Sequence, residues 1–258
     1  MKQFIKNIAC ASVLSACAFT SSAQANIIEL ALVLDESGSM GQSGFNLQVD
    51  AYESIFTNNF YDNYMVNGDT LVVSAYTFSL GVTQEISWTT IVDNASAAAF
   101  GAQFSGGWYS GGFTDTKEAV DVASFDLLNN GIDGDKMIID ISTDGNPYCP
   151  ISRSNCSTTT NARQDALNAA ADALANDVIT NAIGIGSSVT ESFLDDFTTA
   201  GGGFYKLAHN FDSFQSSLEE KLFREINGTA TGTVPSPAPI LLMAAGLMGI
   251  MFRRRNAK

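Results

Sequence analysis

The chain of 258 residues carries 27 acidic and 13 basic residues, which gives a formal net charge of −14 at pH 7. A chain this acidic repels nucleic-acid phosphates and anionic membrane surfaces, so the composition excludes a general nucleic-acid-binding protein. With 45% hydrophobic residues it is too apolar for a disordered acidic tail. Its single histidine, His209, excludes metal sites that need two histidine ligands.

The N-terminus is typical of a secretory signal peptide over residues 1–25. Two lysines precede an uncharged stretch of apolar and small residues, which ends in the small-x-small pattern of a cleavage site at residues 23–25. We expect cleavage after Ala25, followed by export. Residues 14–17 also resemble a lipoprotein processing site, which leaves lipidation of Cys17 as an alternative.

Residues 26–226 predict one alternating β/α domain, because apolar and β-branched runs indicate strands and helically spaced apolar residues indicate helices. Strands are expected at residues 27–34, 70–78, 82–88, 136–142, 178–185 and 204–207, the third of them antiparallel at an edge. Helices are expected at residues 45–60, 94–104, 116–128, 160–176, 191–199 and 211–226. The pattern predicts the α/β class, a doubly wound, mostly parallel central sheet with helices on both faces.

Three polar motifs fall at the carboxyl ends of these strands or just before a helix. They are D-E-S-G-S at residues 35–39, G-G-F-T at residues 111–114 and T-D-G at residues 143–145. Ligands bind at this edge of open α/β sheets. Hydroxyl and carboxylate oxygens suit a hard cation, and octahedral oxygen coordination favours Mg²⁺, with Mn²⁺ or Ca²⁺ as alternatives.

In this order and within a β/α pattern, the motifs resemble the metal-ion-dependent adhesion site of the von Willebrand factor A-type (VWA) domain. The resemblance covers nearly all of the predicted domain and implies a Rossmann-like fold. It also implies non-catalytic binding of a protein or matrix ligand that offers a carboxylate to the metal. The metal-site residues that it implies are Asp35, Ser37, Ser39, Thr114 and Asp144.

Each of these residues also has a purely structural interpretation, which the sequence leaves open. Ser37 and Ser39 could form a turn or cap a helix, and Thr114 could cap the helix that follows it. Asp144 and the glycine after it form a common turn pair. Only the joint occurrence of the three motifs favours a metal site.

The sequence leaves the roles of other residues near the motifs open. Asp140 interrupts an apolar strand, and it either faces the metal site from behind the ligands or pairs with a cation. Glu36 and Asp115 are expected at the rim of the site, facing solvent. Alternatively they tune which ligands approach, because extra negative charge repels carboxylates. Trp108 and Tyr109 either form an exposed binding patch or pack against the second strand.

Cys149 and Cys156 are the only cysteines that remain after removal of the signal peptide, and both follow the third motif closely. In an oxidising compartment they predict a disulfide. The closed loop is short, so the stabilisation is on the order of 2 kcal/mol.

The C-terminus is expected to be a trafficking signal. Residues 227–234 are small and polar and indicate a linker; a Pro-Ser-Pro motif, an apolar run at residues 240–252 and three arginines follow. Residues 235–258 resemble the PEP-CTERM sorting signal of Gram-negative bacteria, although Ser236 replaces the usual Glu. The resemblance implies an exosortase-type processing protease and transient anchoring in the inner membrane. An ordinary tail anchor is the alternative, although the apolar run is shorter than the ~20 residues of a comfortable span.

The two end segments hold six of the 13 basic residues and none of the acidic ones. The segment between them therefore carries seven basic and 27 acidic residues, a formal charge of −20. We expect an exported, non-catalytic adhesion or matrix-binding module at the cell surface or in the extracellular matrix. A structural matrix protein whose metal only stabilises the fold is one alternative, and a metal-dependent hydrolase is a weaker one.

Overall fold

The computed structural model describes residues 25–149 and 159–228. The predicted signal peptide up to residue 24, Cys156 and the predicted sorting signal lie outside these residues. The Cys149–Cys156 disulfide and both end signals therefore stay predictions. Within the described part of the chain, no helix is both long and apolar enough to cross a membrane.

In the described part of the chain, six strands form one central sheet in the order β3-β2-β1-β4-β5-β6. They are β1 (Ile27–Asp35), β2 (Thr70–Phe78), β3 (Val82–Ile91), β4 (Lys136–Thr143), β5 (Val178–Ile185) and β6 (Gly202–Ala208). Every neighbouring pair is parallel except β2 and β3, which pair antiparallel at the edge. The predicted α/β class, the mostly parallel sheet and the antiparallel edge strand are confirmed.

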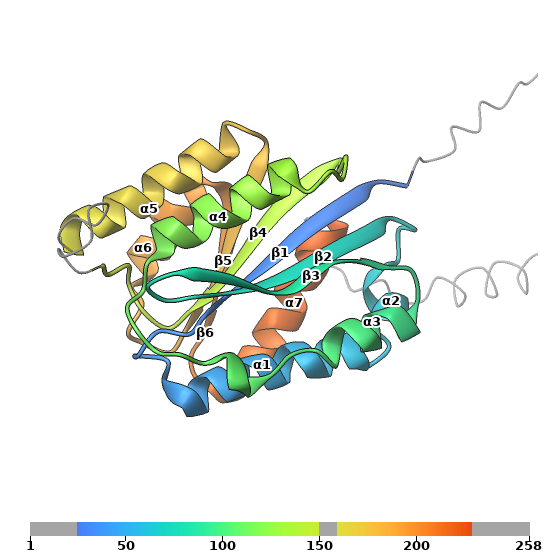
Figure 1. Ribbon diagram of the computed structural model, residues 1–258, viewed down its shortest axis with the longest axis horizontal. Helices are drawn as coiled ribbons and strands as arrows, with labels where there is room; N and C mark the ends of the chain where they lie inside the picture. Colours follow the sequence, from blue (N-terminus) through green and yellow to red (C-terminus); the bar gives the residue numbers. More distant parts are fainter. Residues whose placement is uncertain (1–24, 150–158, 229–258) are drawn as a thin grey trace, which may run out of the picture.

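Helices cover both faces of the sheet (Figure 1). On one face lie α1 (Gly41–Thr57), α2 (Phe60–Tyr64), α3 (Asn94–Gly101) and α7 (Phe214–Asn227), and their apolar residues form one buried cluster with the sheet. On the other face α4 (Thr116–Asn129), α5 (Thr159–Leu174) and α6 (Glu191–Ala200) form the second cluster. Two short 3-10 helices, η1 (Gly106–Trp108) and η2 (Phe211–Ser213), complete the elements of residues 25–149 and 159–228. The doubly wound arrangement follows from these two apolar layers.

Three predicted helices have clearly different boundaries in the structure, and the one expected at residues 94–104 ends at Gly101. The helix expected at residues 45–60 begins at Gly41 and ends at Thr57, and Asn59 adopts a left-handed backbone conformation (φ 54°) before α2 begins. Asparagine tolerates this conformation better than most residues, so it separates two helices that apolar spacing alone would join. The helix expected at residues 211–226 begins as η2, and regular α-helix starts at Phe214.

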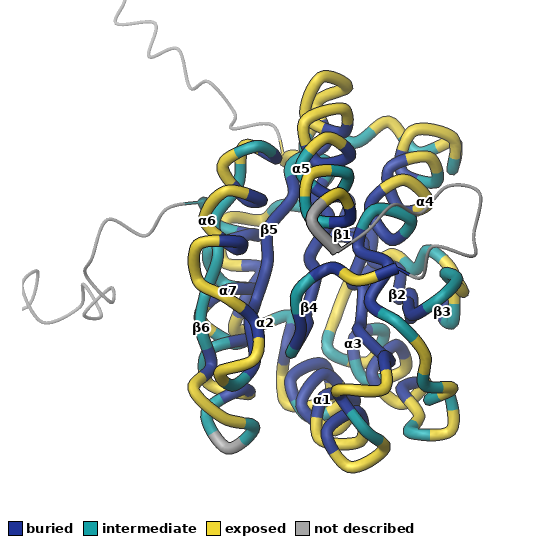
Figure 2. The backbone as a smooth tube through the Cα atoms, turned by 90° about the vertical axis from the view of Figure 1, so that its left-hand side faces the viewer, coloured by how far each residue is buried: buried dark blue, intermediate teal, exposed yellow. Residues whose placement is uncertain are grey.

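The central strand β1 is buried on both sides. Every residue from Ile28 to Asp35 is buried, which agrees with the continuous apolar run in the sequence (Figure 2). The strand order reverses at β1, because β2 and β4 lie on opposite sides of it. The carboxyl ends of β1 and β4 therefore flank the point where open α/β sheets bind ligands.

Candidate metal centre

Asp35 is the last residue of β1 and is fully buried. Its carboxylate joins two of the predicted motifs. The Ser37 amide donates to Oδ1 at 2.7 Å, and the Thr143 hydroxyl at the end of β4 donates to Oδ2 at 2.5 Å. Both oxygens are thus oriented before any ligand arrives.

A chain of hydroxyl groups leads from the β1 loop to the T-D-G motif. The Oγ atoms of Ser37 and Ser39 lie 3.0 Å apart, and Ser39 Oγ donates to Asp144 Oδ1 at 2.8 Å. The N-cap of α1 is Met40, and no side chain caps that helix. Ser37 and Ser39 therefore do not act as caps for α1, one of the structural interpretations left open by the sequence.

Thr114 lies beside this hydroxyl chain. A Cβ atom on Gly145 would lie 3.4 Å from Ser39 Oγ and 3.5 Å from Thr114 Oγ1, so the absent side chain leaves a space bordered by both hydroxyls. The Gly38 amide also donates to the Gly112 carbonyl at 2.9 Å, which ties the first motif to the second. All three motifs therefore meet at the β1–β4 end of the sheet.

The cap of α4 is Asp115 and not Thr114. The Asp115 carboxylate accepts from the Glu118 amide at 3.2 Å. Thr114 instead forms an antiparallel bridge with Tyr148, with backbone N–H···O distances of 3.0 and 2.9 Å. Because the Asp115 side chain supplies the cap, the Thr114 hydroxyl has no capping role in α4.

The two carboxylates of the cluster carry uncompensated negative charge. The pKa of Asp35 is raised to about 6, chiefly by burial. The hydrogen bonds from Ser37 and Thr143 lower this pKa, and the charge of Asp144 adds to the increase. Burial also raises the pKa of Asp144. Among the described residues, no Lys or Arg forms a salt bridge with either carboxylate. Both groups would gain from a cation between them.

The donor set fits a hard cation. Within the part of the chain that the structure describes, no group of three or more His, Cys, Asp or Glu side chains could hold a metal ion. A cation at this site would therefore depend on two carboxylates together with hydroxyl oxygens. All-oxygen ligation of this kind suits Mg²⁺, Mn²⁺ or Ca²⁺ rather than softer metals.

The expectation that Glu36 and Asp115 face solvent is wrong. Glu36 is 6% exposed and Asp115 is 8% exposed. Glu36 Oε2 accepts from the Ser110 amide at 2.8 Å, and Oε1 lies 3.4 Å from the hydroxyl of Ser79, which donates to it. Glu36 thus holds the loop that leads to Thr114, a role that its position between two motif residues did not indicate.

Asp140 lies on the α7 side of the sheet. It forms an ion pair with Lys221, which also pairs with Glu225 at 2.6 Å, and all three side chains are buried. Of the two interpretations of Asp140, the structure supports the pairing with a cation and not a position behind the metal ligands. Glu225 is an unpredicted third member of this buried group.

The aromatic residues before the second motif pack against the α1 side of the molecule. Tyr109 contacts Phe45 with ring centroids 5.8 Å apart, and Trp108 contacts Phe104 at 5.6 Å. They are partly buried against the first apolar cluster. Cys149 is buried as well, with its Sγ 3.2 Å from Asp115 Oδ2.

Two polar residues near the cluster were not assigned a role from the sequence. Thr143 donates to Asp35, although it stands inside the T-D-G motif and could have been considered there. Gln48 of α1 donates to the Asp35 carbonyl at 3.2 Å and accepts from Ser142 at 2.6 Å. Nothing in the helical pattern of α1 distinguishes Gln48 as a buried residue.

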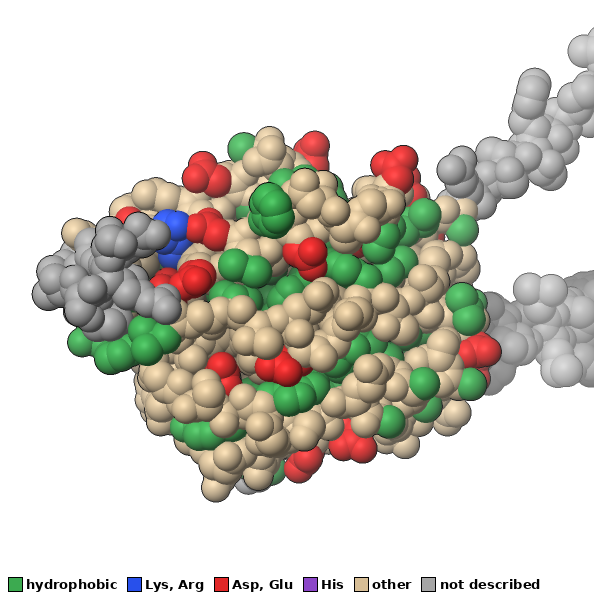
Figure 3. All heavy atoms as spheres, viewed as in Figure 1, with side chains coloured by type: hydrophobic (Ala, Val, Ile, Leu, Met, Phe, Trp, Pro, Cys, Tyr) green, Lys and Arg blue, Asp and Glu red, His purple; other side chains and the backbone are tan. Residues whose placement is uncertain are grey.

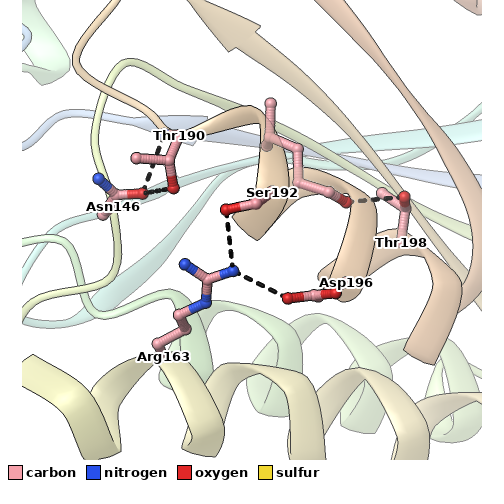
Figure 4. Close-up of polar contacts among 7 residues, drawn as sticks. Asn146, Arg163, Thr190, Ser192, Asp196 and Thr198 are labelled. Carbon is pink, nitrogen blue, oxygen red and sulfur yellow. Dashed lines mark hydrogen bonds and ion pairs between the residues drawn. The ribbon is translucent and has the colours of Figure 1, made fainter.

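The loop after Asp144 is fixed to α6 by Asn146 (Figure 4). Asn146 Oδ1 accepts from the amide and the hydroxyl of Thr190 at 3.1 and 3.0 Å, and its Nδ2 donates to the Ser188 carbonyl at 3.1 Å. Beside it, Arg163 of α5 reaches Asp196 of α6 at 2.9 Å. The Asn146 contacts fix the start of α6 to the loop after Asp144, and the Arg163–Asp196 pair joins α5 to α6.

We expect Asn146→Ala to destabilise the protein by about 1–3 kcal/mol, because three hydrogen bonds are lost and the amide and hydroxyl of Thr190 lose their acceptor. Urea unfolding followed by circular dichroism measures this change. Asn168→Ala on α5, which removes only the contact with Gln164, is the matched control and should change stability little. Equal effects of the two substitutions would contradict the proposed role of Asn146.

Solved structures share the fold at low sequence identity. The PilB minor pilin from Streptococcus sanguinis aligns with a TM-score of 0.61 at 14% identity, over 82% of this chain and 64% of that one. The conserved hypothetical protein BatB from Bacteroides thetaiotaomicron aligns with a TM-score of 0.54 at 16% identity, over 78% of this chain and 100% of that one. A von Willebrand factor type A protein from Catenulispora acidiphila aligns with a TM-score of 0.53 at 13% identity, over 78% of this chain and 43% of that one. These matches establish a VWA-like fold.

Sequence comparison gives the family. No curated protein matches the chain. A family model described as "Protein of unknown function (DUF1194)" matches residues 26–230, most of the chain. The protein therefore belongs to the DUF1194 family.

Proposed function

We propose that the protein is a non-catalytic module that binds a protein or matrix ligand through a divalent cation. Mg²⁺ is the proposed cation, with Mn²⁺ or Ca²⁺ as alternatives. The observation that carries the proposal is the meeting of two unpaired carboxylates and three hydroxyls at the β1–β4 end of the sheet. The residues that would hold the cation are Asp35, Ser37, Ser39, Thr114 and Asp144.

Each side chain has a defined part in this proposal. Asp35 and Asp144 supply the negative charge that attracts the cation, and the three hydroxyls supply neutral oxygens. Neutral ligands leave a bound cation electrophilic, so it would attract a carboxylate from a ligand. Gly38 and Ser39 are exposed to solvent, which gives such a ligand access to the cluster.

A binding role fits the surroundings better than hydrolysis. Asp35 is fully buried and both of its oxygens already accept hydrogen bonds, so it is poorly placed to act as a general base. The solved structures of similar fold include a minor pilin and a VWA-type protein, which is compatible with a binding module.

We also propose that the protein works outside the cell. The predicted signal peptide and the PEP-CTERM resemblance support export, processing by an exosortase-type protease and delivery to the surface or matrix of a Gram-negative bacterium. Contact with the membrane would be limited to the C-terminal segment before processing.

Calorimetric titration with MgCl₂ tests the metal site. We expect one site per chain, and we expect Asp144→Asn to abolish its heat because a charged ligand is lost while the side-chain shape is kept. Asp195→Asn, an exposed carboxylate on α6, is the matched control and should bind Mg²⁺ as the wild type does. If the Asp144→Asn variant gave the same heat of Mg²⁺ binding as the wild type, the proposed metal site would be refuted.

Selection from a peptide-display library tests the ligand. In Mg²⁺ the immobilised protein should enrich peptides that contain Asp or Glu, and EDTA should release them. The Asp144→Asn variant should enrich none. Metal binding and a raised melting temperature without any acid-dependent enrichment would favour a cation that only stabilises the fold.

A further inference from the structure

Two aromatic side chains lie directly beside the proposed metal ligand Thr114. Phe113 precedes it in the chain, and Tyr148 is joined to it by the two hydrogen bonds of the antiparallel bridge. The rings of Phe113 and Tyr148 contact each other, with centroids 5.3 Å apart and planes tilted by 39°. We call Phe113 and Tyr148 the aromatic pair.

The aromatic pair does not serve the core of the protein. Neither residue belongs to the two buried apolar clusters, and Tyr148 is 43% exposed. The Tyr148 hydroxyl makes no hydrogen bond to another residue that the structure describes. The nearby Tyr109 and Trp108, in contrast, pack against Phe45 and Phe104. The loops thus bury some aromatic rings but leave Tyr148 exposed, with Phe113 half-buried beside it.

We propose that the aromatic pair is a second contact point for the ligand. It would select peptides that carry an apolar or aromatic side chain within two residues of the carboxylate offered to the metal. This inference rests on the proposed function of the metal site. Aromatic rings at the surface give a large contact area, and aromatic anchors supply much of the affinity in protein interfaces.

The spacing suits neighbouring residues of one peptide. Directly opposed, hydrogen-bonded residues of an antiparallel pair have Cα atoms about 5.5 Å apart, which sets the separation of Thr114 and Tyr148. An extended peptide advances about 3.3 Å per residue. A side chain one or two positions from the metal-bound acid therefore reaches the aromatic pair.

The charge of the protein favours a peptide over an acidic polysaccharide. The segment between the two end signals carries 27 acidic and seven basic residues. Acidic side chains recur across the face seen in Figure 3, and basic side chains are scarce there. A polymer with a carboxylate on each sugar would meet repulsion along its length, whereas one carboxylate flanked by apolar side chains would not.

Binding of two synthetic peptides in Mg²⁺ tests the proposal. Both contain a central Asp; one has Phe two residues later, and the other has Ser there. We expect the wild type to bind the Phe peptide at least about 10-fold more tightly, and Tyr148→Ser to lose this preference. Tyr148→Phe should keep it, because the ring remains. Phe125→Ser, a 69% exposed aromatic on α4, is the matched control and should not change it.

The outcomes separate this inference from the proposed function. The heat of Mg²⁺ binding, measured by calorimetry on each variant, shows whether the metal site is intact. Tyr148→Ser should bind Mg²⁺ as the wild type does. If both peptides bind equally to the wild type but EDTA still releases them, the aromatic pair has no selective role and the metal-dependent function stands. If neither peptide depends on Asp or on Mg²⁺, the proposed function fails. Tighter Mg²⁺-dependent binding of a polyuronate than of the Phe peptide would also overturn the inference.

Discussion

Lys221→Met is expected to destabilise the protein by about 3–5 kcal/mol, the usual effect of removing one partner of a buried ion pair. Lys221 is completely buried on α7 and pairs with Asp140 of β4 and with Glu225. The substitution leaves the buried Asp140 carboxylate and its neighbour Glu225 without the ammonium group that contacts both. A loss of this size is a large part of the 5–15 kcal/mol that holds a typical domain folded.

Guanidinium unfolding of Lys221→Met and of a matched variant measures the effect. Lys206→Met is suitable because Lys206 also pairs across β6 and α7, with Glu220, but both side chains are partly exposed. Exposed pairs contribute roughly 0–1 kcal/mol. Similar stabilities of the two variants would show that the Lys221 group is not a buried charge cluster.

The same group predicts a pH dependence. Burial, followed by the charge of Asp140, raises the pKa of Glu225 to about 8 from an ordinary 4.5. The unfolded chain releases the Glu225 proton near pH 4.5, whereas the folded protein keeps it to a higher pH. The contribution of Glu225 to stability therefore falls as the pH rises above about 4.5. Glu225→Gln keeps the neutral form and should flatten this part of the stability curve.

Much of the fold could be predicted because its signals are local. The apolar run of β1 indicates a strand buried on both faces, and the alternation of strands and helices implies a parallel sheet. The position of the motifs after strands then predicts their meeting at one edge. Asp35, Ser39 and Asp144 are found within one hydrogen-bonded group as this argument requires.

The unpredicted features depend on contacts between distant residues. Lys221 and Glu225 have the spacing of an exposed ion pair on a helix, and only Asp140 on a separate strand explains their burial. Glu36 is buried because it accepts from Ser110, which lies 74 residues later. Tyr148 meets Thr114 through a bridge between two loops, and loop pairing leaves no periodic pattern in a sequence.

Asp35→Asn is expected to change stability in opposite directions with and without metal. Asn keeps the shape of the side chain, so its Oδ1 can still accept from the Ser37 amide and its Nδ2 can donate to Thr143. It removes a buried charge and one of the two proposed carboxylate ligands. We expect the Mg²⁺-dependent rise in melting temperature to disappear, whereas the metal-free variant should be more stable than the wild type at pH 7.5.

The pKa of Asp35 sets the sign and the size of this effect. Burial raises that pKa to about 6 from 3.8. Between pH 3.8 and about 6, the metal-free folded protein therefore still holds a proton that the unfolded chain has already released. The metal-free wild type should therefore lose stability as the pH rises from about 4 to 6, by up to about 3 kcal/mol, and remain less stable at pH 7.5. The variant has no such step.

Melting curves at pH 5 and pH 7.5, each in EDTA and in 10 mM MgCl₂, measure both parts of the prediction. At 100 times the dissociation constant, a ligand that binds only the folded state adds about 2.7 kcal/mol, so bound Mg²⁺ would offset most of the cost of the buried Asp35 charge. Protonation of Asp35 at pH 5 should weaken this gain in the wild type. If Asp35→Asn gained as much from Mg²⁺ as the wild type, Asp35 would not be a metal ligand. If the metal-free variant were less stable at pH 7.5, its hydrogen bonds rather than its charge would dominate the site.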